Sequence, residues 1–536
     1  MKKSVALFVL AILPALSCVR QNTLVVDMLP EETWWGGFDN PNSWQIKGDY
    51  SFPFDASMEF EVDFSANNYS NNIVPMFVSS KGRYIWSDAP FVAKFQKGKI
   101  RIEGTAPVSL TVAGNTLREA FLAASRTHFP PKGIIPPEEF ISRPQYNTWI
   151  ELMYNQNQDD ILKYANDIVS NGFPDGAVFM VDDNWQKYYG NFEFKPDRFP
   201  DPKAMMDRLH DMGFKVMFWV CPYISPDSPE YRELASKGYL VMDAKEDKPA
   251  IYGWWNGFSA ILDMSNPKAK EWLISRLRKM QELYGVDGFK FDAGDAAPYD
   301  IKNVKVFDGK SYGPLHTELW CTLAEYFPYN EYRASWKMAG TPTVMRLCDK
   351  VYSWDAVGML IPGMLASAME GHVFVCPDMI GGGEFQSFLN IDPKSFDQAL
   401  IVRSCQIHAM MPMMQFSVAP WRILSEDNLE LCRQAAWKHV ELAPYLLEQA
   451  KKSVISGEPI IRPMEYAFPG EGFETCCDQY MLGDRYLVTP MMKPGNVRTI
   501  KLPSGLWQDE TGRRYEGGRI YEIDVPLSRI PYFTHL

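Results

Sequence analysis

Residues 286–295 read Val-Asp-Gly-Phe-Lys-Phe-Asp-Ala-Gly-Asp, a short apolar strand that runs directly into an acidic, glycine-containing turn. Apolar runs like this one recur between about residue 140 and residue 440, and they alternate with helical stretches such as 159–170, 203–212 and 267–284. Eight strand–helix units in one domain predict a (β/α)8 TIM barrel of the α/β class. A doubly wound open sheet is the alternative, but no glycine-rich phosphate fingerprint follows the first strand. The expected barrel strands are 146–150, 177–181, 215–220, 286–291, 329–334, 344–348, 373–376 and 410–416.

The regions on either side of this barrel have the pattern of β-sheets. Between residues 20 and 116, short runs of alternating apolar and polar residues are separated by Gly, Asn and Pro, and a proline-rich linker follows at 129–137. After about residue 455 the β pattern returns. We therefore expect a lipoprotein signal peptide at 1–18, an N-terminal β-sandwich at 19–138, the catalytic barrel at 139–450 and a C-terminal β-sandwich at 451–536.

Charge and the N-terminal segment narrow the class of protein. The net charge of −12 argues against nucleic acid as a partner, because phosphate binding needs basic surfaces. Lys2 and Lys3 precede an apolar run at 5–16 that is too short to span a bilayer, and Cys18 follows it. This pattern resembles a bacterial lipoprotein signal, which predicts lipidation at Cys18 and a lipid-anchored protein in the periplasm or at the cell surface. A plain signal peptide is the alternative, and the sequence does not indicate an oligomeric state.

Carboxylates gather where the predicted strands end. In a TIM barrel these ends form one rim, which carries the active site. A single Asp at a strand end is usually a helix cap or turn residue, but four on one rim with Arg and Trp suit the two-carboxylate chemistry of glycoside hydrolysis. Lys290 points the same way as Asp292 and disfavours a divalent cation there, so we expect no metal and no cofactor, with Mg²⁺ as the alternative. The residues at the strand ends are Asp182, Trp219, Asp292, Arg333, Asp349 and Asp378.

Several motifs between about 140 and 535 resemble glycoside hydrolase family 31. The segment from Lys290 to Asp295 resembles the nucleophile motif of that family, with Asp295 in place of the usual Glu, so the resemblance implies Asp292 as the nucleophile. Asp182 and Trp185 resemble a substrate-binding Asp-x-x-Trp motif after strand 2.

The same resemblance supplies a partner for the nucleophile. The family places an Arg sixteen residues before the acid/base Asp and an aromatic residue five after it, and Arg333, Asp349 and Trp354 fit both spacings. Asp378 resembles the Asp of an Asp-Ile-Gly-Gly segment after strand 7. The resemblance implies a retaining, exo-acting α-glycosidase that acts on an oligosaccharide or glycoside. Its catalytic residues would be Asp292 and Asp349, and its substrate-binding residues Asp182, Trp185, Trp219, Trp255, Lys290, Arg333, Trp354 and Asp378.

Departures from the family pattern bear on the sugar. Pro377 stands where many α-glucosidases of the family have His, and Arg346 begins the segment Arg-Leu-Cys where Trp-Ser-Gly is usual. These features resemble the branch that contains the animal myogenesis-regulating glycosidase and bacterial α-galactosidases. They imply an α-galactosidase first and an α-glucosidase or α-xylosidase second.

Other classes remain open at this point. A non-catalytic carbohydrate-binding protein could use the same barrel, and so could an α-glucan lyase or an aldolase that forms a Schiff base through Lys290.

The apolar neighbours Leu347, Cys348 and Val351 predict a raised pKa for Asp349, as a general acid needs near neutral pH.

Overall fold

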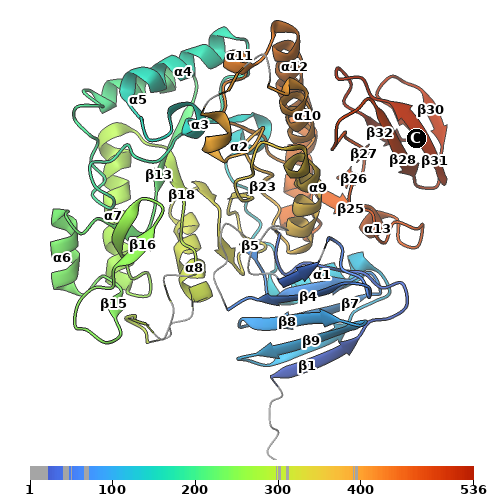
Figure 1. The fold of residues 1–536 in the computed structure, drawn as a ribbon, viewed down its shortest axis with the longest axis horizontal. Coiled ribbons are helices and arrows are strands. Elements are labelled where there is room, and N and C mark those ends of the chain that lie inside the picture. Colours follow the sequence, from blue (N-terminus) through green and yellow to red (C-terminus); the bar gives the residue numbers. More distant parts are fainter. Residues whose placement is uncertain are drawn as a thin grey trace, which may run out of the picture.

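The computed structural model describes residues 22–39, 47–49, 51–65, 72–296, 299, 303–309, 313–389, 391–392 and 396–536. Three parts follow one another along the chain (Figure 1): an N-terminal pair of sheets, a barrel and a C-terminal sandwich. The expected signal segment and Cys18 lie outside the described residues, so lipidation and localisation stay predictions. Within the described ranges, no helix has the length and apolar character needed to cross a membrane.

The central part is an eight-stranded parallel sheet that curls into a barrel. Its strand order is β23-β22-β20-β18-β13-β12-β11-β24, and a bond of 2.9 Å from Ile380 N to Gln415 O joins the two ends of that order. Seven of these strands lie within the predicted runs and β11 begins one residue before its run, so the predicted TIM barrel is confirmed. The strands are β11 (Gln145–Asn147), β12 (Val178–Val181), β13 (Lys215–Val220), β18 (Gly288–Phe291), β20 (Tyr329–Tyr332), β22 (Met345–Arg346), β23 (Val375–Cys376) and β24 (Gln415–Phe416).

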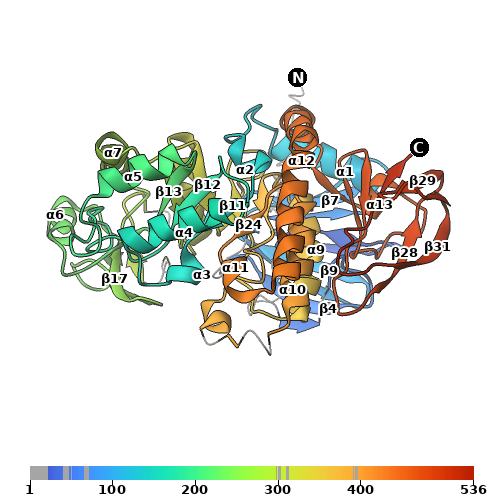
Figure 2. The same ribbon diagram turned by 90° about the horizontal axis from the view of Figure 1, so that it is seen from above.

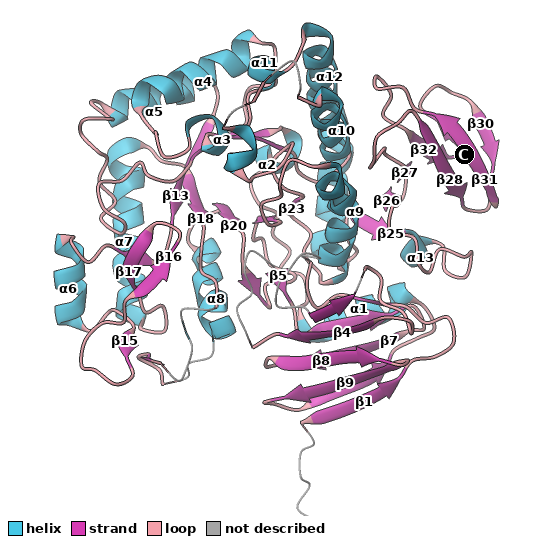
Figure 3. Cartoon of the chain, viewed as in Figure 1, coloured by secondary structure: helices cyan, strands magenta, loops and turns pink. Residues whose placement is uncertain are grey.

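Helices cover the outside of this barrel (Figures 1 and 3). Side chains at their N-termini cap the first turn, as at Asn157 for α4, Asp201 for α5 and Ser353 for α9. α10 and α12 lie side by side in both views and stand between the barrel and the C-terminal sandwich (Figures 1 and 2). The helices are α2 (Glu139–Ser142), α3 (Trp149–Leu152), α4 (Gln158–Ser170), α5 (Pro202–Asp211), α7 (Pro267–Tyr284), α8 (Gly313–Cys321), α9 (Trp354–Met369), α10 (Gln398–Ala409), α11 (Pro420–Ile423) and α12 (Glu426–Ser456), with 3-10 turns η2 (Thr322–Glu325) and η3 (Phe385–Phe388).

The insertion between β13 and α7 packs into two hydrophobic clusters: the main core, through Ile224, Leu234 and Leu262, and a second, smaller one. Trp219, Tyr223 and Ile261 belong to this second cluster, which is separate from the main core of the protein. The insertion was not expected from the sequence. Its elements are β14 (Tyr223–Ile224), α6 (Pro229–Lys237), β15 (Met242–Asp243), β16 (Tyr252–Trp254) and β17 (Gly257–Ile261), and β15 pairs with β19 (Val304–Lys305).

The N-terminal part contains two antiparallel sheets that enclose an aromatic core. Phe54, Phe60 and Phe95 pack there with ring centroids 4.3–5.3 Å apart. β5 (Asn72–Ile73) leaves this part and pairs in parallel with β21 (Ser335–Trp336), which follows barrel strand β20. One sheet is β1 (Thr23–Asp27), β9 (Lys99–Gly104), β8 (Phe91–Gln96), β4 (Glu59–Asp63) and β3 (Lys47–Asp49), the other is β10 (Val108–Val112), β7 (Arg83–Ser87), β6 (Met76–Ser79) and β2 (Trp34–Trp35), and α1 (Leu117–His128) follows them.

The C-terminal part is the predicted sandwich, with Trp507 and Phe533 in its core. The barrel boundary expected at 450 falls inside α12, which continues to Ser456 and ends at Gly457, a residue with a φ of 80°. The sandwich consists of β25 (Ile461–Pro463), β26 (Tyr480–Leu482), β27 (Tyr486–Val488), β32 (Tyr532–His535), β29 (Leu506–Asp509) and β30 (Arg514–Glu516), with β28 (Val497–Leu502) and β31 (Arg519–Asp524) as the second sheet and the short helix α13 (Met464–Ala467) between β25 and β26.

Candidate active site

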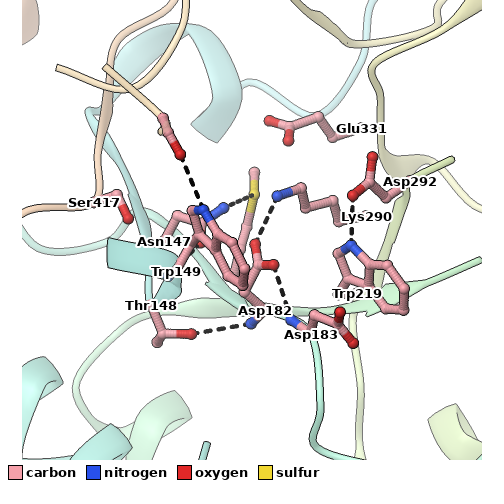
Figure 4. A network of polar contacts seen from close by, with 12 residues as sticks. Asn147, Thr148, Trp149, Asp182, Asp183, Trp219, Lys290, Asp292, Glu331 and Ser417 are labelled. Atoms are coloured by element: carbon pink, nitrogen blue, oxygen red, sulfur yellow. Dashed lines mark hydrogen bonds and ion pairs between the residues drawn. The ribbon is translucent and has the colours of Figure 1, made fainter. Parts of the chain in front are cut away.

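Asp292 is the first residue after β18, and its two carboxylate oxygens have different partners. Oδ2 accepts a hydrogen bond of 2.7 Å from the indole Nε1 of Trp219 (Figure 4), and Oδ1 lies 2.8 Å from Arg333 Nε. Burial alone would raise the pKa of Asp292, but the positive charges of Arg333, Lys290 and Arg346 and the bond from Trp219 outweigh it and lower the pKa to about 2. The carboxylate is therefore ionised throughout the physiological pH range, as a nucleophile requires.

The turn after Asp292 is built from two left-handed residues. Ala293 has a φ of 56° and Gly294 a φ of 76°, and a Cβ at Gly294 would lie 2.4 Å from the Trp320 ring. The non-glycine residue in this region carries backbone strain of about 1–3 kcal/mol, which is typical of functional sites. The turn brings Asp295 back to Arg333, whose Nη2 donates to Asp295 Oδ2 at 2.6 Å. Arg333 thus bridges the nucleophile candidate and Asp295, the residue that departs from the family motif.

A buried ion pair lies beside the nucleophile candidate. Lys290 Nζ donates to Asp182 Oδ2 at 2.6 Å, and both side chains are about 4% exposed (Figure 4). Burial alone would lower the pKa of Lys290, but the carboxylates of Asp182, Asp292 and Glu331 raise it overall. Thr148 Oγ1 accepts a bond from the backbone N of Asp182 and fixes this end of β12. The pair supplies a fixed cation and a fixed acceptor at the pocket floor.

Asp349 follows β22 and stands in different surroundings from those expected. Its side chain is 42% exposed, and Oδ1 accepts a bond of 2.6 Å from Arg346 Nη1. The apolar environment predicted from its sequence neighbours is not found, because β22 ends at Arg346 and the chain turns so that Asp349 faces the pocket. Gly383 lies against this carboxylate, since a Cβ there would be 2.6 Å from Asp349 Oδ1.

Arg346 connects three carboxylates and is only 2% exposed. Besides Asp349 it contacts Asp378 Oδ1 at 3.1 Å and Glu331 Oε1 at 3.7 Å. Arg346 and Glu331 were not predicted as site residues. The departure from the family pattern at Arg346 was the available signal, and Glu331 gave none because it lies within a strand.

Asp378 lies behind the pocket wall rather than in it. The side chain is fully buried, and its oxygens accept bonds from the backbone N of Lys350 and of Met379 and from Arg346. Burial raises the pKa of Asp378 to about 6, against the lowering effect of Lys350 and Arg346. The structure thus places this predicted substrate-binding residue where it holds the loop after β23.

Trp185 and Trp354, also predicted to bind substrate, do not line the pocket. Trp185 is fully buried, and its Nε1 donates to Trp219 O. Trp354 begins α9, and its Nε1 donates to Asp397 Oδ2.

A pocket of about 230 Å³ opens where the remaining predicted residues meet. Trp219 and Trp255 contribute aromatic surface to it, and so does a cluster of Trp149, Tyr154 and Phe385 with ring centroids 5.3–6.1 Å apart. That second cluster comes from the loops after β11 and β23, so no single sequence motif could indicate it. The predicted residues that line the pocket are Asp182, Trp219, Trp255, Lys290, Asp292, Arg333 and Asp349, joined by Trp149, Tyr154, Asp183, Arg346, Met379, Gly383, Glu384 and Phe385.

Comparison with known proteins identifies related chains. Residues 141–449 match the glycosyl hydrolases family 31 TIM-barrel domain, and residues 457–535 match the glycosyl hydrolase family 31 C-terminal domain. The chain is 31% identical over 421 residues to the myogenesis-regulating glycosidase of Mus musculus, covering 76% of this chain and 58% of that protein. It is 27% identical over 503 residues to an α-xylosidase of Emericella nidulans, covering 85% and 61%. The chain thus spans about three-fifths of the length of these two relatives.

A solved structure has the same fold. The dextranase of Flavobacterium johnsoniae, solved in complex with glucose, matches 96% of this chain and 66% of its own, with a TM-score of 0.82 and 21% identity.

Proposed function

Because the chain belongs to glycosyl hydrolase family 31, we propose that it is a retaining α-glycosidase that removes a terminal sugar from an α-glycoside. The observation that carries this proposal is the pair of carboxylates in one pocket: Asp292, held ionised by Arg333 and Trp219, and the exposed Asp349. The pocket volume of about 230 Å³ is below the roughly 300–1,000 Å³ of sites for drug-sized ligands, which suits one sugar ring and exo action.

The proposed reaction has two steps. Asp292 Oδ attacks the anomeric carbon while Asp349 donates a proton to the departing glycosidic oxygen, which gives a β-linked glycosyl-enzyme and a free alcohol. Asp349 then takes a proton from water, the water oxygen attacks the anomeric carbon, and Asp292 leaves as a carboxylate. Two inversions leave the product in the α configuration. Lys290, paired with Asp182, and Arg333 lie at the pocket floor and can bind ring hydroxyls.

The sugar that we propose is glucose or xylose in α linkage. Support comes from the names of the relatives, an α-xylosidase and a dextranase solved with glucose. The α-galactoside expected from the sequence departures has no such support and becomes an arm of the test.

The test is a panel of aryl α-glycosides of glucose, xylose and galactose, with the anomer of the first product read by NMR. We expect hydrolysis of the glucoside or xyloside with α product first, and a loss of at least about a thousandfold in kcat in Asp292→Asn. Asp349→Ala should retain more activity on aryl leaving groups than on sugar leaving groups, since only the latter need a proton. Asp243→Ala, at a half-buried carboxylate in the insertion whose Oδ1 accepts bonds from its own loop, is the matched control.

Two results would contradict the proposal. Full activity in Asp292→Asn would show that Asp292 is not the nucleophile. Sugar binding by calorimetry without hydrolysis of any panel member would favour the non-catalytic alternative.

A further inference from the structure

The insertion after β13 contributes one wall of the pocket through a hairpin tip. Trp255 stands at the tip between β16 and β17, is 49% exposed, and its ring lies 4.8 Å from the guanidinium carbon of Arg333. Since Arg333 also pairs with Asp292, this wall contacts the arginine that holds the nucleophile candidate. The position of the tip therefore affects both the shape of the pocket and its charge.

Apolar packing holds the base of this hairpin and leaves its tip open. The Trp254 ring packs against Tyr223 at 4.4 Å and Tyr189 at 4.8 Å, within the second hydrophobic cluster. The Trp255 ring packs edge-on against Trp254 at 5.0 Å. What stays open at the tip is Gly257, which has a φ of 106° and no atom within 4 Å of a Cβ built there, and Phe258, which is 74% exposed.

A polar contact also ties the tip to the barrel. Asn256, next to Trp255, donates from Nδ2 to Asp183 Oδ2 at 2.5 Å and to Tyr189 Oη at 2.9 Å. Asp183 follows Asp182 at the end of β12, a strand that β11 and β13 flank in the barrel sheet. It is 2% exposed. The contact thus joins a surface hairpin tip, a class of segment more mobile than the strands it connects, to the rim of the barrel.

We propose that Asp183 is a positioning residue that fixes Trp255 through Asn256 and thereby sets which sugars the pocket accepts. This inference rests on the proposed function for its effect on substrates, but the mechanical link between Asp183 and the hairpin does not.

A purely stabilising role does not explain Asp183. Burial, with the negative charge of Asp182, raises its pKa to about 7 against the hydrogen bonds from Tyr189 and Asn256, so the ionised carboxyl is unfavourable where it sits. Its other oxygen, Oδ1, is buried with no hydrogen-bond partner among the described residues. The side chains that gain a hydrogen-bond acceptor from Asp183 are Tyr189 and, at the hairpin tip, Asn256.

Hydrogen–deuterium exchange tests the mechanical link without any substrate. In Asp183→Ala we expect faster exchange in peptides covering residues 251–261 and unchanged exchange in the barrel strands β13 and β18. Asp183→Asn keeps an acceptor oxygen for Asn256 and should recover most of the protection. Unchanged exchange at 251–261 in Asp183→Ala, or an equal rise throughout the barrel, would overturn the proposal.

A double-mutant cycle tests the effect on substrate. We expect Asp183→Ala to lower kcat/KM about tenfold on the preferred aryl glycoside, mainly through KM, and to change the ratio between two sugars. If Asp183 acts through Trp255, the same substitution in a Trp255→Ala background has little further effect. If the effects of Asp183→Ala and Trp255→Ala on kcat/KM multiply in the double variant, the two residues act independently, and Asp183 does not set specificity through Trp255. If the wild type hydrolyses no glycoside, the proposed function fails while the exchange experiment still decides the role of Asp183.

Discussion

Arg346 is the residue on which most of the charge balance of the site depends. It is buried, and it contacts Asp349, Asp378 and Glu331, of which the last two are buried as well. The planar guanidinium can reach several carboxylates at once, which an ammonium cannot. The segment Arg-Leu-Cys before Asp349 therefore begins with the residue that links these three carboxylates.

Replacing Arg346 by Met should lower stability more than loss of a surface ion pair. The change leaves Asp378 and Glu331 buried beside an uncharged chain, and we expect a loss of about 3–5 kcal/mol in the free energy of unfolding. Urea unfolding measures it. Arg519→Met, which removes an exposed pair with Glu516, is the control and should cost less than about 1 kcal/mol. Equal stability of Arg346→Met and wild type would show that Arg346 does not stabilise the buried carboxylates.

The sequence predicted the charged residues of the pocket better than its aromatic ones. Asp292, Arg333 and Asp349 come from strand ends and fixed spacings, which the barrel converts into proximity. For Trp185 the spacing was not enough, because Asn184 has a φ of 76° and this left-handed residue turns the chain so that the indole enters the core. Phe385 begins the 3-10 turn η3, far along the chain from Trp149, and only tertiary structure brings the two rings to a centroid distance of 5.4 Å.

At the scale of elements, α9 ends on a buried carboxyl. Glu370 follows the last helical residue, is fully buried, and neither carboxyl oxygen has a hydrogen-bond partner among the described residues. Burial, with the nearby charge of Asp39, raises the pKa of Glu370 well above its usual range. A negative charge at a helix C-terminus is also disfavoured by the helix dipole.

Glu370→Gln should therefore stabilise the protein in a pH-dependent way. Because the pKa of Glu370 is raised in the folded state, its carboxyl keeps a proton there that the unfolded state loses above about pH 4.3. The free energy of unfolding of the wild type therefore falls as pH rises above about 4.3. Glu370→Gln has no carboxyl to ionise, so its free energy of unfolding does not fall for this reason. We expect equal stability near pH 4 and an advantage of about 1–3 kcal/mol by pH 8.

Thermal and urea unfolding between pH 4 and pH 8 measure the difference for Glu370→Gln. Glu426→Gln, at a side chain that is 81% exposed, is the control and should show no pH-dependent gain. A constant difference at all pH values would show that Glu370 does not titrate between the folded and unfolded states.

The sequence pattern located elements well where hydrophobic periodicity was strong. α7 begins and ends where expected, and β13 does too. The insertion was missed because its strands are only two to five residues long, so no periodic signal extends far enough to be recognised.

At the scale of the whole molecule, the N-terminal sheets and the barrel share one hydrophobic core. The main cluster runs from Trp34 and Phe77 in the N-terminal part to Phe218 and Phe291 in the barrel. The pairing of β5 with β21 adds backbone hydrogen bonding directly after Arg333. The two parts are separate in the sequence pattern but continuous in their packing.

We therefore expect the N-terminal sheets and the barrel to unfold together. In hydrogen exchange along a urea gradient, peptides from β4 to β9 should lose protection at the same urea concentration as peptides from β13 and β18. The β28–β31 sheet, which packs on the separate C-terminal core, provides the comparison and should lose protection at lower urea. Loss of protection in the N-terminal sheets well before the barrel would contradict a shared core.

The place of the insertion on the barrel has a consequence for protein engineering. Residues 223–262 leave and rejoin the barrel next to each other, since Leu262 N donates to Pro222 O. A chimera that exchanges this block between family members would transplant a pocket wall, provided that the recipient barrel fits the apolar contacts of Ile224, Leu234 and Leu262 with the main core. Such a graft needs a matching docking pair on the recipient, an acceptor at position 183 for the amide at 256.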